Sequence, residues 1–462
     1  MLIAGLVLTS CSKWLDVRPK SQVKETDMFS TEHGFVDALT GVYTLMTNTS
    51  LYGDNMTMGF MDALAQQYDI GGSSSAFYQA GLYNYQDGNV KSTIGGIWSS
   101  MYNAIANDNN ILVNIDAHRD LFSGQNYNLV KGEALGLRAF MHFDLLRMFG
   151  PVYTTNADKL SIPYVTTVSL KVTPQLKASA VMDSILADLN AAEKLLIADS
   201  ASNSFAPDDN WLLAFRQNHL NLWAVRGLLA RVYLYKGDRL NALKYALQVI
   251  NAKKFQFVQK VALTGSVTSK DRTFRTEHLF SLHIYNLKAT VDKYFKFSIG
   301  NSYQLTLPES RLNNIFEVAA GGSTDYRYAF LWELDGAVRF PSKLWQEAKV
   351  DAAYKELMPL IRLPEMYFIA AECAPDVPAA IGYLNVIREN RGISMLPVTL
   401  PGGNLQNEIF KSYEKEFYCE GQLWFYYKRL NRSSIAGTSM PISDAIYVFP
   451  LPDEEVQFGN RG

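Results

Sequence analysis

Residues 220–250, LNLWAVRGLLARVYLYKGDRLNALKYALQVI, contain two helical patterns separated by a tight turn. The inner faces of both patterns combine small and large apolar residues at helical spacing: Leu229, Ala230, Tyr233, Ala242, Tyr245, Ala246 and Val249. Gly237 and Asp238 supply the turn, because glycine tolerates a positive φ and aspartate can cap the helix that follows. This combination is typical of a tetratricopeptide helical hairpin.

Helical periodicity extends along most of the chain. The predicted helices cover residues 35–46, 97–115, 129–148 and 181–196. Two further stretches, 102–107 and 364–391, are similar to degenerate copies of the hairpin. Stacked hairpins bury one continuous core, so the sequence predicts a mainly α fold built on a tetratricopeptide-like scaffold.

Two long segments interrupt the helical pattern. Residues 47–96 are rich in Gly, Ser, Asn and Tyr, and residues 255–341 are rich in Thr, Ser, Gly and aromatics. Segments of this length in a compact domain usually carry function. At the other end of the chain, residues 442–460 are expected to be extended, because Pro450 and Pro452 oppose helix formation.

The charge balance argues against a nucleic-acid partner. Among the 462 residues, 43 are Lys or Arg and 45 are Asp or Glu, which gives a formal net charge of -2. Such a chain has no basic field with which to neutralise phosphates. Aromatic residues make up 13% of the chain, which exceeds the needs of a core, so some of them are expected to face a ligand.

The first residues resemble a lipoprotein signal. The apolar run MLIAGLVL is too short to span a bilayer and ends in Leu8-Thr9-Ser10-Cys11. Small residues before a cysteine form a lipobox, in which the Cys11 thiol carries the lipid. We therefore expect residues 1–10 to be a signal-peptide remnant and residues 11–32 to be a lipidated tether to a membrane.

The sequence holds no recognisable catalytic or metal-binding motif. Its six histidines lack metal-ligand spacing, and it has neither a nucleophile elbow nor a phosphate-binding glycine loop. Cys373 and Cys419 lie in apolar helical segments, where buried free thiols are favoured over a disulfide. We therefore expect no catalysis and no cofactor.

Ordered blocks along nearly the whole chain resemble the SusD/RagB family, the nutrient-binding outer-membrane lipoproteins of Bacteroidetes. The blocks are residues 11–17, 29–32, 41–43, 98–112, 132–151, 361–372, 384–392, 416–421 and 449–454. The most specific block is the one that begins Gly132-Glu133-Ala134. Leu423 and Tyr426 depart from the pattern, since the family usually has Arg and Asp there, and this indicates an altered ion-pair network.

The resemblance implies a SusD-like fold, in which a helical scaffold supports a variable, loop-rich ligand lobe. Residues 33–462 then form one domain, with the scaffold mainly in 97–252 and 360–432 and the lobe mainly in 47–96 and 255–341. The resemblance also implies a partner, a SusC-like TonB-dependent transporter. The lipoprotein would sit on this transporter as a lid, on the extracellular side of the outer membrane.

Several of the matched polar residues are interpreted as structural. Glu133 with Arg138, and Glu372 with Arg388, are predicted to form ion pairs or caps that lock helices. Catalytic roles are disfavoured for all four.

The candidate ligand site follows from the chemistry of sugars. Sugars present apolar faces and rings of hydroxyls, so their sites need aromatic platforms beside polar side chains. The first loop-rich segment offers Tyr52, Asp54, Asn55, Tyr68, Asp69, Tyr78, Tyr83 and Tyr85, and the second offers Tyr303, Asp325, Tyr326, Arg327, Tyr328 and Trp332. Each of these can also serve local packing, and Asp325 and Arg327 can simply pair with each other.

These observations together predict noncatalytic binding of an oligosaccharide or polysaccharide and its delivery to the transporter. Two alternatives stay open. The same fold can capture peptides, which an exposed strand edge and a charged cleft would favour. A periplasmic scaffold could instead bind proteins, which an apolar helical groove without a lobe cleft would favour.

Overall fold

The computed structural model describes residues 25–70, 72–169, 171–201, 206–210, 212–266, 269–347, 352 and 355–459. Helices dominate this part of the chain, and its strands form two short sheets of two strands each. The predicted mainly α fold is therefore confirmed. The expected signal-peptide remnant and the lipidation site Cys11 lie outside the described residues.

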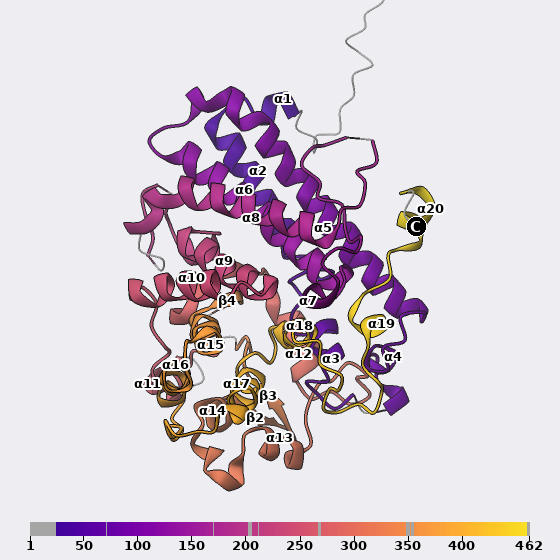
Figure 1. Cartoon of the computed structure of the whole chain (residues 1–462), viewed down its shortest axis with the longest axis vertical. Helices are drawn as coiled ribbons and strands as arrows, with labels where there is room; N and C mark the ends of the chain where they lie inside the picture. The colour runs from indigo at the N-terminus through magenta and orange to yellow at the C-terminus, as the bar shows by residue number, and fades with distance from the viewer. Residues whose placement is uncertain are drawn as a thin grey trace, which may run out of the picture.

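Four long helices form the upper layer in Figure 1: α2 (Glu32–Met46), α5 (Gly88–Asn114), α6 (Asn126–Phe149) and α8 (Ala178–Leu195). They confirm the four helices predicted from periodicity. However, α5 begins at Gly88 rather than at residue 97, because the Asp87 carboxylate caps it by accepting from the backbone N–H groups of Asn89 and Val90. Helix α6 is the centre of the layer and packs against α2, α5 and α8.

The hairpin predicted at residues 220–250 is present as α9 (Leu222–Lys236) and α10 (Arg239–Ala252). Gly237 ends α9 with a φ of 87°, in the left-handed region where glycine is least strained. The Asp238 side chain then caps α10 by accepting from the backbone N–H of Asn241. The turn residues thus act as the sequence predicts.

A second hairpin, α15 (Leu363–Cys373) and α16 (Val377–Asn390), packs on α10 and confirms the degenerate copy predicted at residues 364–391. The other copy, predicted at residues 102–107, is wrong as a separate hairpin. These residues lie inside α5, where Ala104 and Ile105 are buried, and α5 packs along α6.

The sheets join segments that are distant in sequence. Strand β1 (His278–His283) pairs antiparallel with β4 (Leu357–Arg362), and β2 (Trp332–Asp335) pairs with β3 (Val338–Pro341). The remaining helices are short or lie in the second half of the chain: α1 (Glu25–Met28), α3 (Phe60–Leu64), α4 (Tyr78–Gly81), α7 (Tyr153–Asn156), α11 (Lys260–Thr264), α12 (Leu287–Phe295), α13 (Glu309–Ile315), α14 (Tyr326–Leu331), α17 (Gly402–Glu416), α18 (Gln422–Arg429), α19 (Asp444–Tyr447) and α20 (Asp453–Phe458).

The C-terminal segment differs from the expectation that it is extended. It contains α19 and α20, the two short helices nearest the C-terminus in Figure 1. Pro452 is the N-cap of α20. Proline has no N–H, but a helix start leaves its first N–H groups without intrahelical partners, so a proline there costs little.

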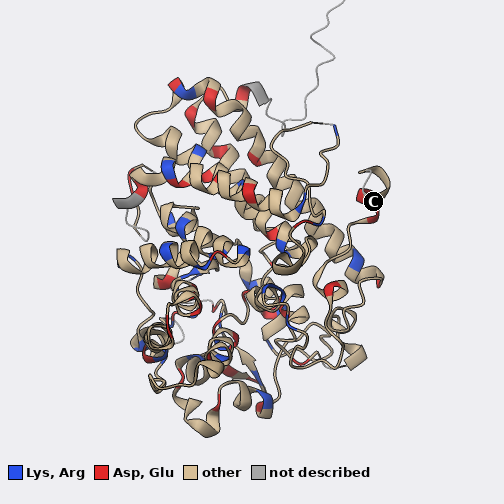
Figure 2. Cartoon of the chain, in the orientation of Figure 1, with Lys and Arg blue, Asp and Glu red and all other residues tan. Residues whose placement is uncertain are grey.

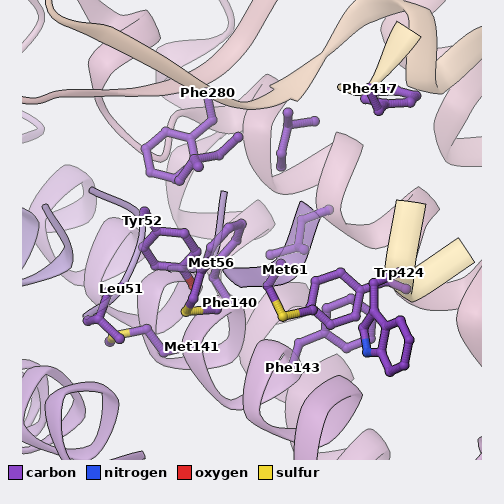
Figure 3. Packing of buried hydrophobic residues seen from close by; sticks show 14 of the residues in the cluster. Leu51, Tyr52, Met56, Met61, Phe140, Met141, Phe143, Phe280, Phe417 and Trp424 are labelled. Carbon is purple, nitrogen blue, oxygen red and sulfur yellow. The ribbon is translucent and has the colours of Figure 1, made fainter. Parts of the chain in front are cut away.

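Residues 51–68 of the first loop-rich segment form a buried wedge in the core. Tyr52, Met56 and Met61 lie among side chains of α6 in Figure 3, and the Tyr52 ring is 5.6 Å from that of Phe140. Almost every residue from 51 to 68 is buried. Burial of this segment fixes the position of the loops that follow it.

Two predicted ion pairs have other partners. Glu133 accepts from Arg216 at 2.5 Å, while Arg138 binds Asp188 at 2.7 Å. The predicted Glu133–Arg138 pair is therefore wrong, although both residues do lock helices together.

The second predicted pair, Glu372 with Arg388, is also wrong. Glu372 binds Arg429 at 2.6 Å, and the nearest carboxylate to Arg388 is Glu408, at 4.0 Å. The favoured state of the cysteines is confirmed, since Cys373 and Cys419 are free and buried.

Charges of both signs are interspersed over the molecule, as Figure 2 shows. No helix in the described part of the chain has the length and apolar character that a membrane span requires.

Candidate functional site

The two loop-rich segments meet at an open cleft beside Tyr303. The cleft has a volume of about 380 Å³, within the range of small-molecule sites. Its walls are Asp54, Asn55, Phe60, Ala76, Phe77, Ala80, Asn89, Val90, Ser92, Thr93, Lys293, Tyr294 and Tyr303. We call it the Tyr303 cleft. Tyr303 is 41% exposed, so part of its ring is available to a ligand.

Lys293, near the end of α12, brings a positive charge to the exposed ring. Its ammonium lies 4.1 Å from the centroid of Tyr303, a cation–π arrangement. It donates a hydrogen bond to the Tyr294 hydroxyl at 3.2 Å and stays 3.9 Å from Asp54. Because an ammonium has three N–H groups and the side chain is 39% exposed, donors remain for a ligand in the cleft.

Asp54 forms the buried side of the cleft. The Tyr294 hydroxyl donates to it, at 2.6 and 2.7 Å from its two oxygens. Burial raises the pKa of Asp54 to about 6, although the Tyr294 hydrogen bond and the Lys293 charge both act to lower it. Gly59 makes room for this pair, since a Cβ at that position would lie 2.2 Å from Asp54 Oδ1.

Further polar side chains line the cleft. Asn89 and Thr93 come from the first turns of α5, and Asn55 comes from the buried wedge. Asn89 is exposed and Asn55 is half-buried. Amide side chains both donate and accept hydrogen bonds, which is the capacity that sugar hydroxyls require.

A second hollow, of about 420 Å³, lies beside the cleft and contains the predicted residue Asp69. Its walls are Asp69, Ile70, Ser74, Ser75, Asn301, Ser302, Gln304, Thr306, Leu307, Pro308 and Val338. The backbone N–H of Ala76 donates to the Ser302 carbonyl at 2.9 Å, and that of Asp69 donates to the Thr306 carbonyl at the same distance. These bonds hold the two loop-rich segments together between the hollows.

Five of the predicted aromatic platforms are buried: Tyr52, Tyr68, Tyr83, Tyr85 and Trp332. The Tyr52 hydroxyl donates to Asp144 at 2.7 Å, and the Tyr85 hydroxyl donates to the Ile446 carbonyl at 2.6 Å. The structure therefore places these five rings in the packing of the wedge and of the sheets, with no broad face toward solvent.

Arg327 is also buried. It binds Asp325 at 2.6 Å and Glu416 at 2.8 Å. The interpretation that Asp325 and Arg327 pair with each other is confirmed. Both belong to a buried group of ion pairs, and neither lines the Tyr303 cleft or the second hollow.

The other three predicted tyrosines are half-buried and line neither hollow. The Tyr326 ring packs 6.0 Å from that of Phe330, and the Tyr328 ring lies 5.4 Å from that of Phe316. Tyr78 is the first residue of α4.

The cleft also contains residues that sequence reasoning did not single out, namely Phe77, Asn89, Lys293 and Tyr294. Lys293 and Tyr294 belong to an amphipathic pattern in α12 that resembles any surface helix. The adjacent Lys293 and Tyr294 in the second loop-rich segment could have indicated the cleft from the sequence, because a cation beside aromatic rings is a common ligand-binding arrangement.

No group of three or more His, Cys, Asp or Glu side chains that could hold a metal ion occurs among the described residues.

Two family models match the chain. The first, described as "Starch-binding associating with outer membrane", covers residues 13–234, and the second, described as the SusD family, covers residues 338–457. A curated relative, SusD-like protein P2 of Formosa agariphila, is 23% identical over 98% of this chain and 96% of its own length.

Solved structures share the fold. A SusD superfamily protein from Bacteroides thetaiotaomicron matches with a TM-score of 0.73 and 21% identity, over 93% of this chain and 98% of that one. A SusD-like carbohydrate binding protein from Bacteroides vulgatus matches with a TM-score of 0.72 and 19% identity, over 93% and 97% of the two chains.

Proposed function

Because the chain belongs to the SusD/RagB family, we propose that it captures a nutrient glycan at the outer membrane without catalysis and delivers it to a SusC-like TonB-dependent transporter. The observation that carries the proposal is the Tyr303 cleft. This cleft lies between the two loop-rich segments and combines an exposed ring, an ammonium and two amide side chains.

The chemistry of the cleft suits a sugar unit. The exposed part of the Tyr303 ring offers an apolar surface for the C–H groups of a sugar, and Asn55, Asn89 and Lys293 can bond its hydroxyls. The second hollow, which contains Asp69 and lies next to the cleft, gives room for a further sugar unit of the same glycan. Tyr78, Tyr326 and Tyr328 remain candidates for more distant units.

The proposed location rests on sequence and family. The lipobox at Cys11 would carry the lipid that anchors the chain. The matching family is described by starch binding and association with the outer membrane, which supports a place at that membrane. The similar Bacteroides vulgatus protein is a carbohydrate binding protein, which supports carbohydrate as the ligand class.

Calorimetry against a panel of neutral and charged oligosaccharides and short peptides tests the proposal. Tyr303→Ala is expected to weaken binding of the best glycan about 10- to 150-fold, because loss of one aromatic contact removes about 1.5–3 kcal/mol. Tyr285→Ala is the matched control, since Tyr285 is 88% exposed in the same segment and lines neither hollow.

Each outcome has a definite meaning. Loss of binding in Tyr303→Ala but not in Tyr285→Ala supports the cleft as the glycan site. Glycan binding that neither substitution changes places the site elsewhere. Binding of peptides alone replaces glycan capture with peptide capture, and glycan shortening during incubation would show that the protein is an enzyme.

A further inference from the structure

A small cavity with charged and apolar side chains in its wall lies inside the helical scaffold and shares no wall residue with the Tyr303 cleft. Its volume is about 40 Å³. Its walls come from five helices, α6, α9, α15, α17 and α18. We call it the scaffold cavity. It is too small for a sugar ring, so it has no part in the proposed glycan site.

Both carboxylates of the scaffold cavity are paired with arginines. Arg231 donates from Nε and Nη2 to the two oxygens of Glu365, at 2.6 and 2.7 Å. Arg429 binds the two oxygens of Glu372 in the same manner, at 2.6 and 2.8 Å. These are fork-to-fork pairs, in which every carboxylate oxygen accepts from a guanidinium.

Two donors of the wall have no acceptor among the described residues. Arg231 Nη1 and the Tyr235 hydroxyl are buried and make no hydrogen bond to the described residues. The two residues are only 6% and 3% exposed. Burial raises the pKa of Tyr235, and it also raises that of Tyr413 in the same wall, so both hydroxyls keep their protons and remain donors.

A buried donor without an acceptor lowers the stability of the fold, and the loss is largest when the donor belongs to a charged group. A cavity of this kind needs about 10–15 Å³ for each water-sized body. The scaffold cavity therefore has room for about three water-sized bodies, so it can hold one small ion with water beside it. A water molecule in the cavity would need acceptors for its own two protons, whereas an anion needs none.

We propose that the scaffold cavity binds one small monovalent anion, of the size of chloride, held by Arg231 Nη1 and the Tyr235 hydroxyl. Such an ion accepts from every free donor and requires no acceptor in return. It joins α9, which carries both donors, to the helices that carry Glu365, Tyr413 and Arg147. The anion is a structural part of the scaffold and is independent of the glycan.

Bromide provides a direct test, because it replaces chloride and scatters X-rays anomalously. In crystals of the full chain grown in sodium bromide, an anomalous peak is expected in the scaffold cavity, within hydrogen-bond distance of Arg231 Nη1 and the Tyr235 hydroxyl. A cavity without an anomalous peak, with water alone in the electron density, would overturn the proposal.

A second measurement works in solution. The melting temperature is compared in sodium bromide and in sodium gluconate at equal ionic strength, because gluconate is too large for the cavity. A bound halide raises the melting temperature by mass action, so a rise of several degrees specific to bromide is expected. An equal melting temperature in both salts would contradict the site.

Tyr235→Phe separates the anion from an ordinary packing role. It removes one proposed ligand atom and leaves the ring, so the bromide-specific rise should fall to half or less. Tyr153→Phe is the matched control, because its ring lies 6.1 Å from that of Tyr235 but is not part of the cavity wall. If Tyr235→Phe retains the full bromide effect, its hydroxyl does not bind the ion.

Discussion

Arg362 and Glu416 form a salt bridge at 2.7 Å, and solvent reaches neither side chain. This bridge is the centre of an ionic core whose residues lie within two residues of the ends of β1, β3, β4, α14, α16, α17 and α18. The core contains four positive and four negative side chains: Asp325, Arg327, Lys343, Arg362, Arg391, Glu277, Glu416 and Glu420. Its charges balance, as burial of so many ions requires.

Glu416→Gln is expected to destabilise the fold by about 3–5 kcal/mol, because it leaves one buried guanidinium charge uncompensated. Arginine neighbours hold the pKa of Glu416 well below its usual range in spite of burial. Urea denaturation measures the loss. Glu309→Gln is the control: Glu309 binds Arg339 at 3.2 Å on the surface, where such a pair contributes about 0–1 kcal/mol. Equal losses in both variants would contradict the role of the core.

The ionic core also shows why sequence reasoning predicted helices better than contacts. Helices α6 and α9 follow from local spacing, which is visible in the sequence. The partners of ion pairs do not follow from local spacing, because they come from segments that are distant in sequence. Glu133 lies five residues from Arg138 in sequence, yet binds Arg216, because that arginine reaches it from a separate segment of the fold.

The ligand site was only partly predictable for a similar reason. Composition indicated the two segments that meet at the cleft, and Tyr303 and Asp69 do line hollows there. Composition could not distinguish these from Tyr52 and Tyr68, which belong to the same tyrosine-rich segment as Asp69 but enter the core. Whether an aromatic residue faces ligand or core is decided by tertiary packing.

Gly237→Ala tests the turn of the α9–α10 hairpin. A side chain at a φ of 87° is strained, so a loss of about 1–2 kcal/mol is expected in urea denaturation. Gly41→Ala is a control for which a change of the opposite sign is expected. Gly41 lies within α2 and a Cβ there meets nothing within 4 Å, so alanine should stabilise the helix by about 0.5–1 kcal/mol. Changes of the same sign would rule out backbone strain as the cause.

Asp54→Asn tests the buried carboxylate of the cleft. The pKa of Asp54 is about 6 in the folded protein, against about 3.9 for an unfolded aspartate. Between these pH values the folded state binds more protons, so stability falls as pH rises from about 4 to 6 and then levels off.

The variant should therefore gain about 1–3 kcal/mol over the native protein as pH rises through this window, measured by urea denaturation at several pH values. Asp69→Asn serves as the control, because Asp69 is exposed and lies in the neighbouring second hollow. If the difference between Asp54→Asn and the native protein does not change with pH, the carboxylate is not held as the structure indicates.

Gly59→Ala tests whether space at Gly59 keeps the cleft in shape. The added Cβ would lie 2.2 Å from Asp54 Oδ1 and 3.2 Å from the Tyr294 hydroxyl, so Asp54 must move and the geometry of its hydrogen bonds with Tyr294 must change. We expect a loss of about 1–3 kcal/mol in stability, as in other overpacked sites. Weaker glycan binding should accompany this loss, because Tyr294 is part of the cleft wall.

A double-mutant cycle identifies the cause of the loss at Gly59. Asp54→Ala removes the atom that the new Cβ would strike, so the clash disappears in the Gly59→Ala, Asp54→Ala double variant. Its stability loss should then be smaller than the sum of the two single losses by at least about 0.5 kcal/mol, the lower bound for residues in contact. Additive losses would mean that Gly59 is needed for its backbone conformation rather than for the space it leaves to Asp54.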